Sequence, residues 1–129
     1  MEIKVGLIGE VKEMVCDGNT AKTVGSGSLE VFATPAMIAL MEKASCRALE
    51  GYLDEGTTTV GTKVDVEHLA ATPLGMEVTV RSTVTEIDGR RICFIVEAFD
   101  EAGLIGKGNH ERFVVFSEKF MAKTNSKKQ

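Results

Sequence analysis

Hydrophobic positions follow a helical period over one long stretch of the chain, residues 34 to 52. At about 100° per residue, its apolar side chains fall on one broad face. The centre of this face is formed by Met37, Leu40, Met41, Ala44 and Ala48, and its margins by Ile38, Leu49 and Tyr52. Thr34 is a suitable N-cap, since its hydroxyl can accept a hydrogen bond from a free amide of the first turn. Pro35 fits the first helical position and Gly51 the stop.

Most of the remaining chain alternates between apolar and polar residues with the period of two that is typical of strands. Strands are expected at residues 10–16, 57–69, 76–87, 91–100 and 104–118, with a short β-prone piece at 20–24. Asp88-Gly89 predicts a tight hairpin between two of them. The tail from Lys119 to Gln129 is expected to fray.

Two of the predicted strands have informative faces. In residues 76–87, one face is formed by Val78, Val80, Ser82 and Val84. In residues 57–69, the period of two places on one face Val60, Thr62, Val64, Val66 and His68. If the valines of this second strand face the helix, His68 faces it too, close to the end of the strand.

The order of elements is a strand, one long helix and then four strands in a meander. A single helix buries its apolar face against one side of an antiparallel sheet. We therefore predict an α+β chain with the hotdog fold, a single domain over residues 1–129. In this fold an antiparallel sheet of about five or six strands wraps the central helix. An uncovered sheet edge favours pairing across a two-fold axis, so a homodimer is expected.

Composition and charge narrow the choice of partners. The net charge of −4 argues against nucleic acid or an anionic membrane as the main partner. No apolar run reaches the roughly 20 residues that span a bilayer, and the first residues lack the features of a signal peptide. The three cysteines form no Cys-x-x-Cys pair, so the sequence predicts neither a zinc site nor a disulfide framework. A reducing cytoplasm is the expected compartment.

His68 is the first candidate for chemistry. A histidine that faces the helix near a strand end can act as a general acid or base, because its pKa lies near the working pH. On residue type alone, a buried histidine satisfied by a backbone carbonyl is the commoner case. Both interpretations stay open from the residues themselves.

Glu42 and Thr34 are the candidates on the helix. Glu42 falls at the border of the apolar face, where a carboxylate is partly desolvated. It either reaches out to water as a border residue or orients His68 or a water molecule. Thr34 has a sufficient role as the N-cap. Yet the amides at a helix N-terminus also converge on anions, and a thioester oxyanion is one.

The strands add further candidates. Gly61 interrupts a β-branched run, where a glycine permits close approach by a ligand or another backbone. Arg112 and His110 share one face of the last strand, and a structural role is the commoner case for both. Cys46 lies mid-helix with no histidine near it in sequence, so it is rejected as a nucleophile.

Five segments of the sequence form a recognisable set. They are Val31-Phe32-Ala33-Thr34, Leu40-Met41-Glu42, His68-Leu69-Ala70-Ala71-Thr72-Pro73 with Gly75, Asp88-Gly89-Arg90-Arg91, and Gly108-Asn109-His110-Glu111-Arg112 with Glu118-Lys119-Phe120. In this order they resemble the fluoroacetyl-CoA thioesterase family of hotdog proteins. The resemblance extends from about Val11 to Lys123. Its His-x-Ala-x-Thr-Pro and His-Glu-Arg elements are specific together and weak singly.

The resemblance implies an enzyme that hydrolyses a short-chain acyl-CoA thioester to the free acid and CoA. The family's catalytic threonine, glutamate and histidine fall on Thr34, Glu42 and His68. Its active-site glycine and arginine fall on Gly61 and Arg112. The resemblance implies no metal and no cofactor, since CoA is part of the substrate, and it implies a site at the dimer interface.

One departure from the family concerns substrate choice. The family's fluoroacetyl-CoA enzyme has a long lid with a gating phenylalanine before its central helix. Here the interval from Val24 to Glu30 is short, contains two glycines and has no aromatic residue. We therefore expect at most a modest preference for fluoroacetyl-CoA.

Two other functions stay open on sequence alone. A hotdog hydratase or dehydratase acting on acyl-CoA would resemble an Asp-x-Asn-x-x-His pattern, which does not occur in this sequence. A non-catalytic acyl-CoA sensor or ligand-binding module would keep the groove without needing three polar groups in it.

Overall fold

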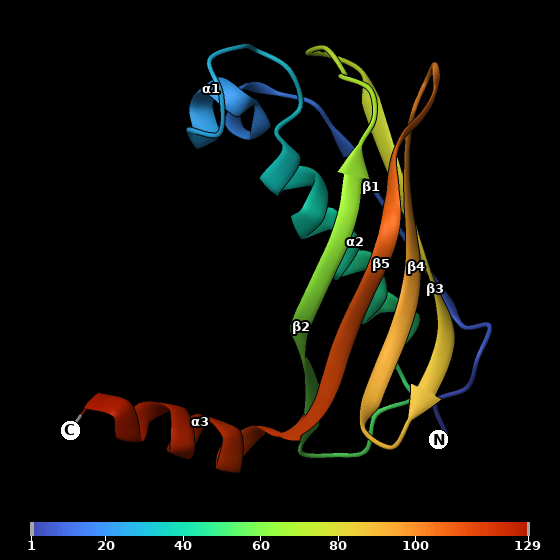
Figure 1. The fold of residues 1–129 in the computed structure, drawn as a ribbon, viewed down its shortest axis with the longest axis vertical. Helices are drawn as coiled ribbons and strands as arrows, with labels where there is room; N and C mark the ends of the chain where they lie inside the picture. Colours follow the sequence, from blue (N-terminus) through green and yellow to red (C-terminus); the bar gives the residue numbers. More distant parts are fainter. Residues whose placement is uncertain (1, 129) are drawn as a thin grey trace.

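In the computed structural model, which describes residues 2–128, one long helix lies against one face of a five-stranded antiparallel sheet (Figure 1). The helix is α2 (Thr34–Ala48). The strands are β1 (Ile8–Met14), β2 (Thr57–His68), β3 (Glu77–Asp88), β4 (Arg91–Asp100) and β5 (Gly103–Phe116). The minor helices are η1 (Asp17–Asn19), α1 (Ala21–Val24), α3 (Ser117–Asn125) and η2 (Ser126–Lys128). The predicted hotdog fold is confirmed. No helix among the described residues is long and apolar enough to cross a bilayer.

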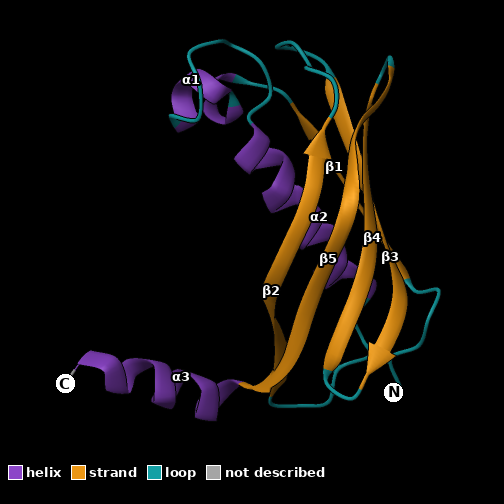
Figure 2. Ribbon diagram, viewed as in Figure 1, coloured by secondary structure: helices purple, strands orange, loops and turns teal. Residues whose placement is uncertain are grey.

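The order of strands across the sheet is β1-β3-β4-β5-β2 (Figure 2). The predicted four-strand meander is therefore wrong in one respect: β3, β4 and β5 follow one another as hairpins, but β2 pairs with β5 at the far edge. The connection from β2 to β3, residues 69–76, is long enough to cross the end of the sheet. Backbone contacts hold it to the segment before α2, where the Phe32 amide donates to the Thr72 carbonyl at 2.9 Å.

The core lies between α2 and the middle strands. The predicted apolar face of the helix is buried, and so is the predicted face of β3, formed by Val78, Val80, Ser82 and Val84. The buried serines of these two faces satisfy each other, because the Ser45 and Ser82 hydroxyls lie 2.7 Å apart and Ser45 also donates to the Met41 carbonyl at 2.8 Å. Paired hydroxyls can be buried without the cost of an unmet hydrogen bond.

Strand β1 begins at Ile8, earlier than the predicted residue 10, and includes Gly9. A Cβ atom at this position would overlap the Ala44 carbonyl and the Ala48 amide of α2. Glycine therefore lets the backbone of β1 pass directly against the helix backbone. Periodicity could not identify this residue as part of a strand, because its role depends on the absence of a side chain.

The start of α2 differs from the prediction in a way that matters for chemistry. The N-cap residue is Ala33, and Thr34 is already helical, with Pro35 beside it in the first turn. No side chain caps the helix. The prediction that the Thr34 hydroxyl caps the helix is wrong, and this hydroxyl is free to bond elsewhere. At the other end the helix stops at Ala48, and Gly51 turns the chain with a φ of +81°.

Two segments fold as helices where the sequence predicted otherwise. Residues 20–24 read as β-prone, but the Thr20 hydroxyl accepts from the Thr23 amide and Gly25 ends the turn with a φ of +86°, which together define α1. The tail was expected to fray, yet α3 continues directly from β5 and projects past the β2 edge of the sheet (Figure 1). Its residues are mostly good helix formers, which outweighs the position at the chain end.

A bulge in β2 changes which residues share a face. Gly61 pairs with Arg112, but the next pair is Lys63 with Glu111, so Thr62 is an extra residue. Directly paired residues of antiparallel strands lie on the same face. The face that looks toward the helix therefore contains Gly61, Val64, Val66 and His68, whereas Val60 and Thr62 fall outside it. The uninterrupted period of two that the sequence predicted is wrong at this point.

Candidate active site

Thr34 and His68 contact each other at one end of the molecule. Thr34 stands in the first turn of α2 and His68 is the last residue of β2, and the Thr34 Oγ1 lies 2.8 Å from the His68 Nδ1. The Phe32 ring meets the imidazole edge-on, with centroids 6.4 Å apart and an interplanar angle of 82°. The sequence placed His68 on the helix-facing side, and the contact agrees with that prediction.

The surroundings of His68 favour its neutral form. Burial lowers the pKa of this imidazole below the usual 6.5, and the backbone of Ala70 opposes the shift only in part. The second nitrogen, Nε2, is buried and has no hydrogen-bond partner among residues 2–128. A neutral imidazole with one nitrogen on a hydroxyl can accept a proton from it, which is the requirement for a general base.

A hollow of about 250 Å³ opens over this pair. It is lined by Ala21, Ser26, Val31, Phe32, Thr34, His68, Leu69, Ala70 and Ala71. Apart from the Thr34–His68 pair, most of this lining is small or apolar. Such a lining suits a short acyl group held against one polar pair.

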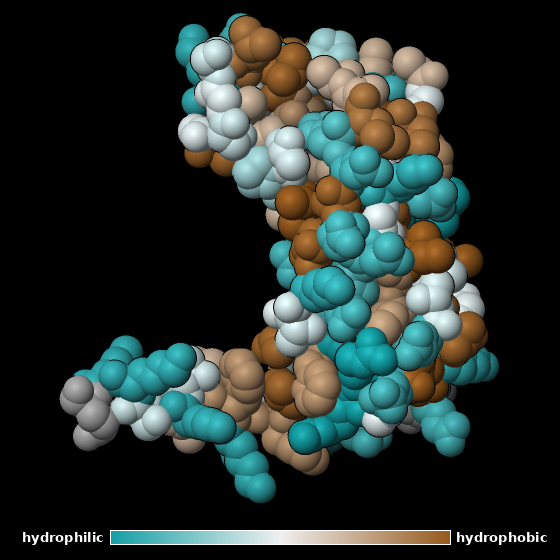
Figure 3. Space-filling view, in the orientation of Figure 1, coloured by the Kyte–Doolittle hydropathy of each residue, from teal (hydrophilic) through white to brown (hydrophobic). Residues whose placement is uncertain are grey.

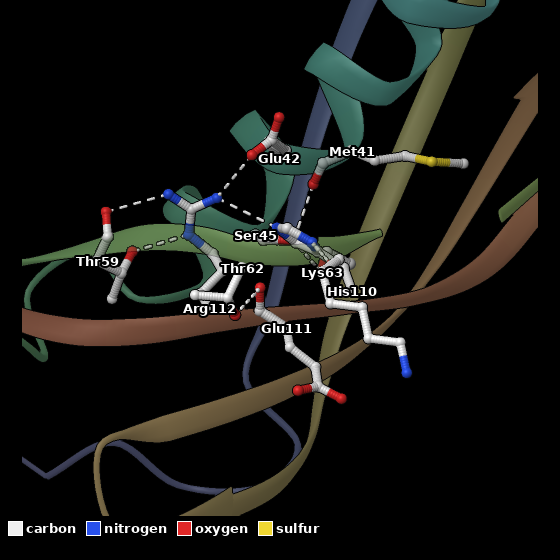
Figure 4. A network of polar contacts seen from close by, with 10 residues as sticks. Met41, Glu42, Ser45, Thr59, Thr62, Lys63, His110, Glu111 and Arg112 are labelled. Carbon is white, nitrogen blue, oxygen red and sulfur yellow. Dashed lines mark hydrogen bonds and ion pairs between the residues drawn. The ribbon is translucent and has the colours of Figure 1, made fainter. Parts of the chain in front are cut away.

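Glu42 lies in a second cluster, which is built around Arg112 (Figure 4). The Arg112 Nη1 donates to the Glu42 Oε2 at 3.2 Å, and the same guanidinium donates to the hydroxyl and carbonyl of Thr59 at 2.9 and 3.1 Å. The arginine side chain is 7% exposed and the glutamate side chain 41% exposed. The carboxylate is thus held by a buried cation while one side of it stays open to solvent.

His110 also belongs to this cluster, where it has a structural role. Its Nδ1 lies 2.7 Å from the Lys63 carbonyl, which can only accept, so Nδ1 carries the proton and donates. Nε2 then accepts from the Arg112 Nη1 at 3.2 Å. Burial first, and the Arg112 charge in addition, lower the pKa of His110. His110 is thus a buried histidine with both ring nitrogens bonded, which agrees with the structural role that the sequence favoured for it, and its ring stacks on Phe94 with centroids 5.8 Å apart.

Gly61 lies directly beneath the Glu42 carboxylate. A Cβ atom here would come within 2.5 Å of the Glu42 Oε2 and within 3.3 Å of the Arg112 Nη1. The sequence predicted close approach by a ligand or another backbone at this glycine; the close neighbour in the structure is instead the end of a side chain of α2. The bulge after Gly61 brings it onto the same face as His68.

The five predicted site residues thus fall into two groups: Thr34 with His68, and Glu42 with Gly61 and Arg112. Thr34 and Glu42 are eight residues apart on one helix, about 12 Å along its axis. Within one protomer the Glu42 carboxylate therefore does not orient His68. Sequence reasoning missed Thr59, which holds Arg112, although its position two residues before Gly61 on the same strand could have indicated it.

Comparison with known proteins identifies the family. A model of the FlK family, described as fluoroacetyl-CoA-specific thioesterase, matches residues 15–118. The chain belongs to this family of thioester hydrolases. It is 47% identical over 98 residues to the fluoroacetyl-CoA thioesterase of Streptantibioticus cattleyicolor, a match that covers 76% of this chain and 70% of that protein.

Solved structures of FlK superpose closely on this FlK-family chain. One has a TM-score of 0.92 at 38% identity, with 98% of each chain covered. A second, a threonine-to-serine variant of FlK in complex with acetyl-CoA, has a TM-score of 0.90 at 38% identity and covers 98% of this chain and 100% of that one. A hotdog fold with the same course of helix and sheet is thus shared over nearly the whole chain.

The segment that precedes α2 is short and open in this FlK-family chain. After α1, residues 25–30 form an exposed connection without regular structure. No aromatic residue stands between Val24 and Val31. The only large apolar side chain there, Leu29, is exposed and does not cover the Thr34–His68 pair.

Proposed function

We propose that this chain hydrolyses short-chain acyl-CoA thioesters to the free acid and CoA, with Thr34 and His68 at the reacting carbonyl. The observation that carries the proposal is the 2.8 Å contact between the Thr34 hydroxyl and the His68 Nδ1 within the small-sided hollow. The substrate class is supported by FlK, whose threonine variant was crystallised with acetyl-CoA and which has also been crystallised, as another variant, with fluoroacetate and CoA.

Two routes use the same pair. In the first, the Thr34 Oγ attacks the thioester carbonyl while His68 takes its proton. The thiolate of CoA then leaves with that proton, and water cleaves the acyl-threonine to release the acid. In the second, His68 removes a proton from a water that attacks the carbonyl directly, and Thr34 holds the thioester. Trapping of an acyl-threonine by rapid acid quench and mass spectrometry selects the first route; its absence during turnover selects the second.

The oxyanion that forms at the carbonyl needs donors. The first amides of α2 have no partner within the helix, and the helix dipole is positive at that end. Thr34 stands on this first turn, so a carbonyl held by its hydroxyl lies close to those amides. We assign them as the oxyanion donors, with the backbone near Gly61 as the alternative.

Glu42, Gly61 and Arg112 join the site from the partner subunit in this proposal. Strand β2 is an open edge, and α2 packs mainly against β1 and β3, so the helix-side face of β2 stays uncovered. Each cluster includes one residue of this face, Gly61 in one and His68 in the other. Antiparallel pairing of two β2 edges makes a homodimer in which the Glu42 carboxylate of one protomer orients the water, or the threonine, beside the other's Thr34 and His68.

The test is a panel of acetyl-, propionyl- and butyryl-CoA incubated with the protein and a thiol reagent. We expect release of free CoA that is lost in the Thr34→Ala and His68→Ala variants. Thermal stabilisation by acyl-CoA without any turnover would instead support the non-catalytic sensor and would contradict hydrolysis.

A further inference from the structure

Helix α3 carries an apolar side that the rest of its own chain does not cover. It leaves the body of the molecule at the end of β5 and projects past the β2 edge (Figure 1). Phe116, Phe120 and Met121 are 55%, 38% and 50% exposed. A nine-residue helix is marginal in water on its own, so this one needs a surface to pack against.

A second exposed apolar set lies at the opposite end of β2. It consists of Val24, Leu29, Leu69 and Leu74. Leu69 lines the Thr34–His68 hollow, and the other three lie on segments that also contribute to its lining, namely α1 and the connections 25–30 and 69–76. We call this set the mouth patch. Figure 3 shows that the molecule is deeply hollowed between α3 at one end and the α1 region at the other. The β2 edge borders this hollow.

A second copy of the chain fits both surfaces at once. If two β2 edges pair antiparallel, the beginning of one strand lies beside the end of the other. Because α3 stands at the Thr57 end of β2 and the mouth patch at the His68 end, each α3 then meets the partner's mouth patch. In a two-fold dimer, the contact between α3 of one copy and the mouth patch of the other occurs twice. The two apolar surfaces together therefore form one self-complementary interface.

Charge indicates what α3 does at that place. The segment 117–128 contains four lysines, Lys119, Lys123, Lys127 and Lys128, and one carboxylate, Glu118, in a chain with a net charge of −4. Among the described residues that line the Thr34–His68 hollow, none is lysine or arginine. The nucleotide part of CoA carries a diphosphate and a further phosphate, and these anions need cationic partners that this hollow lacks in a single protomer.

We propose that α3 of one protomer covers the mouth patch of its partner and that its lysines bind the phosphates of the acyl-CoA held there. The proposal rests on the function proposed above for the substrate. It makes each active site complete only in the dimer, and it assigns the nucleotide-binding role to a helix that contributes nothing to the chemistry.

The first test compares two substrates that share the same thioester. Acetyl-CoA carries the nucleotide, and S-acetyl-N-acetylcysteamine lacks it. For the double variant Lys119→Glu/Lys123→Glu, we expect kcat/KM for acetyl-CoA to fall by about tenfold or more, mainly through KM, while that for the truncated thioester stays unchanged. The matched control, Lys4→Glu/Lys12→Glu on the β1 side of the molecule, should leave both values unchanged.

Equal loss on both substrates, or no loss on either, would overturn the role of α3 while leaving hydrolysis intact.

If the unmodified protein cleaves neither thioester, the proposed function fails, and the docking of α3 is then decided by cross-linking alone. For this, Met121→Cys and Leu69→Cys are combined in a chain whose exposed Cys16 and Cys46 are replaced by serine. Oxidation should give a covalent dimer, and a control pair of Met121→Cys with Lys12→Cys should not. A monomer after oxidation of the first pair would overturn the docking.

Discussion

The contact between the Thr34 hydroxyl and the His68 Nδ1 carries most of the chemical argument. Both residues were candidates from the sequence, but the predicted role of Thr34 as the N-cap would have occupied its hydroxyl. The helix instead begins one residue earlier, at the Ala33 N-cap, and the hydroxyl turns to the histidine. Sequence patterns place the end of a helix only to within one or two residues, so they do not decide which residue is the N-cap.

At this scale the first prediction concerns His68. The His68→Ala variant should lower kcat by about 10²–10⁴-fold, the usual contribution of a positioned acid or base, with little change in thermal unfolding. In the unmodified protein, kcat/KM should begin to decrease only when the pH falls below 6.5, the ordinary pKa of histidine. The reason is that burial lowers the pKa of this base. Steady-state rates between about pH 5 and pH 8 measure both. Unchanged turnover in the variant would remove His68 from the mechanism.

The two histidines also predict how stability depends on pH. Burial lowers the pKa of both His68 and His110 in the folded state. Between that lowered value and 6.5 the unfolded chain binds more protons, so stability rises with pH over this interval and is lost as the pH falls through it. Thermal unfolding melts from pH 7.5 to pH 5 should show the decline, and His110→Gln should reduce its slope. A slope of the opposite sign would contradict the neutral state assigned to His110.

At the scale of elements, the bulge in β2 decides which side chains meet. Alternation along residues 57–69 predicted the strand itself and the inward position of His68, and both are confirmed. It also predicted that Gly61 lies on the opposite face from His68, which the extra residue Thr62 reverses. A bulge cannot be recognised in a pattern of apolar and polar positions. The position of Gly61 on the same face as His68 could therefore not be predicted from the sequence.

The prediction at this scale concerns Gly61. The Gly61→Ala variant should keep the fold, since the glycine is exposed and its φ is not in the left-handed region. Its new methyl group would overlap the Glu42 carboxylate and displace it from Arg112. We expect a loss of kcat of about tenfold to a hundredfold, the order of cost of a misplaced catalytic group. Thermal melts check that the variant remains folded, and full activity in the folded variant would contradict the role proposed for Glu42.

At the scale of the whole molecule, the sequence predicted the central helix, the antiparallel sheet and the exposed edge. It placed β2 wrongly beside β3, because nothing in a strand's own pattern says which partner it takes. It also missed α3, since helix propensity in a tail as short as residues 119–129 is weak evidence against fraying. Both errors concern the β2 edge, where the proposed dimer forms.

Substrate choice is a property of this larger scale, because it depends on what covers the pocket. The open connection over residues 25–30 offers no packed apolar gate, so rejection of acetyl-CoA would rest on one small substituent. Such a difference is worth only about 10–200-fold. We predict at most this preference when kcat/KM is measured for fluoroacetyl-, acetyl-, propionyl- and butyryl-CoA under the same conditions. A preference above about 10⁴ would mean that the pocket discriminates without a lid.

The central claim is that each active site is built from two protomers. It is tested most directly by mixing two variants that are inactive alone, Glu42→Gln and His68→Ala, after control sedimentation shows that each is a dimer of about twice the 13.9 kDa chain. Once the subunits exchange, half of the dimers are mixed, and each mixed dimer then holds one intact site out of two. We predict recovery of about a quarter of the unmodified activity with acetyl-CoA. If the mixture stays as inactive as its components, Glu42 and His68 act within one chain or not together, and the shared site is contradicted.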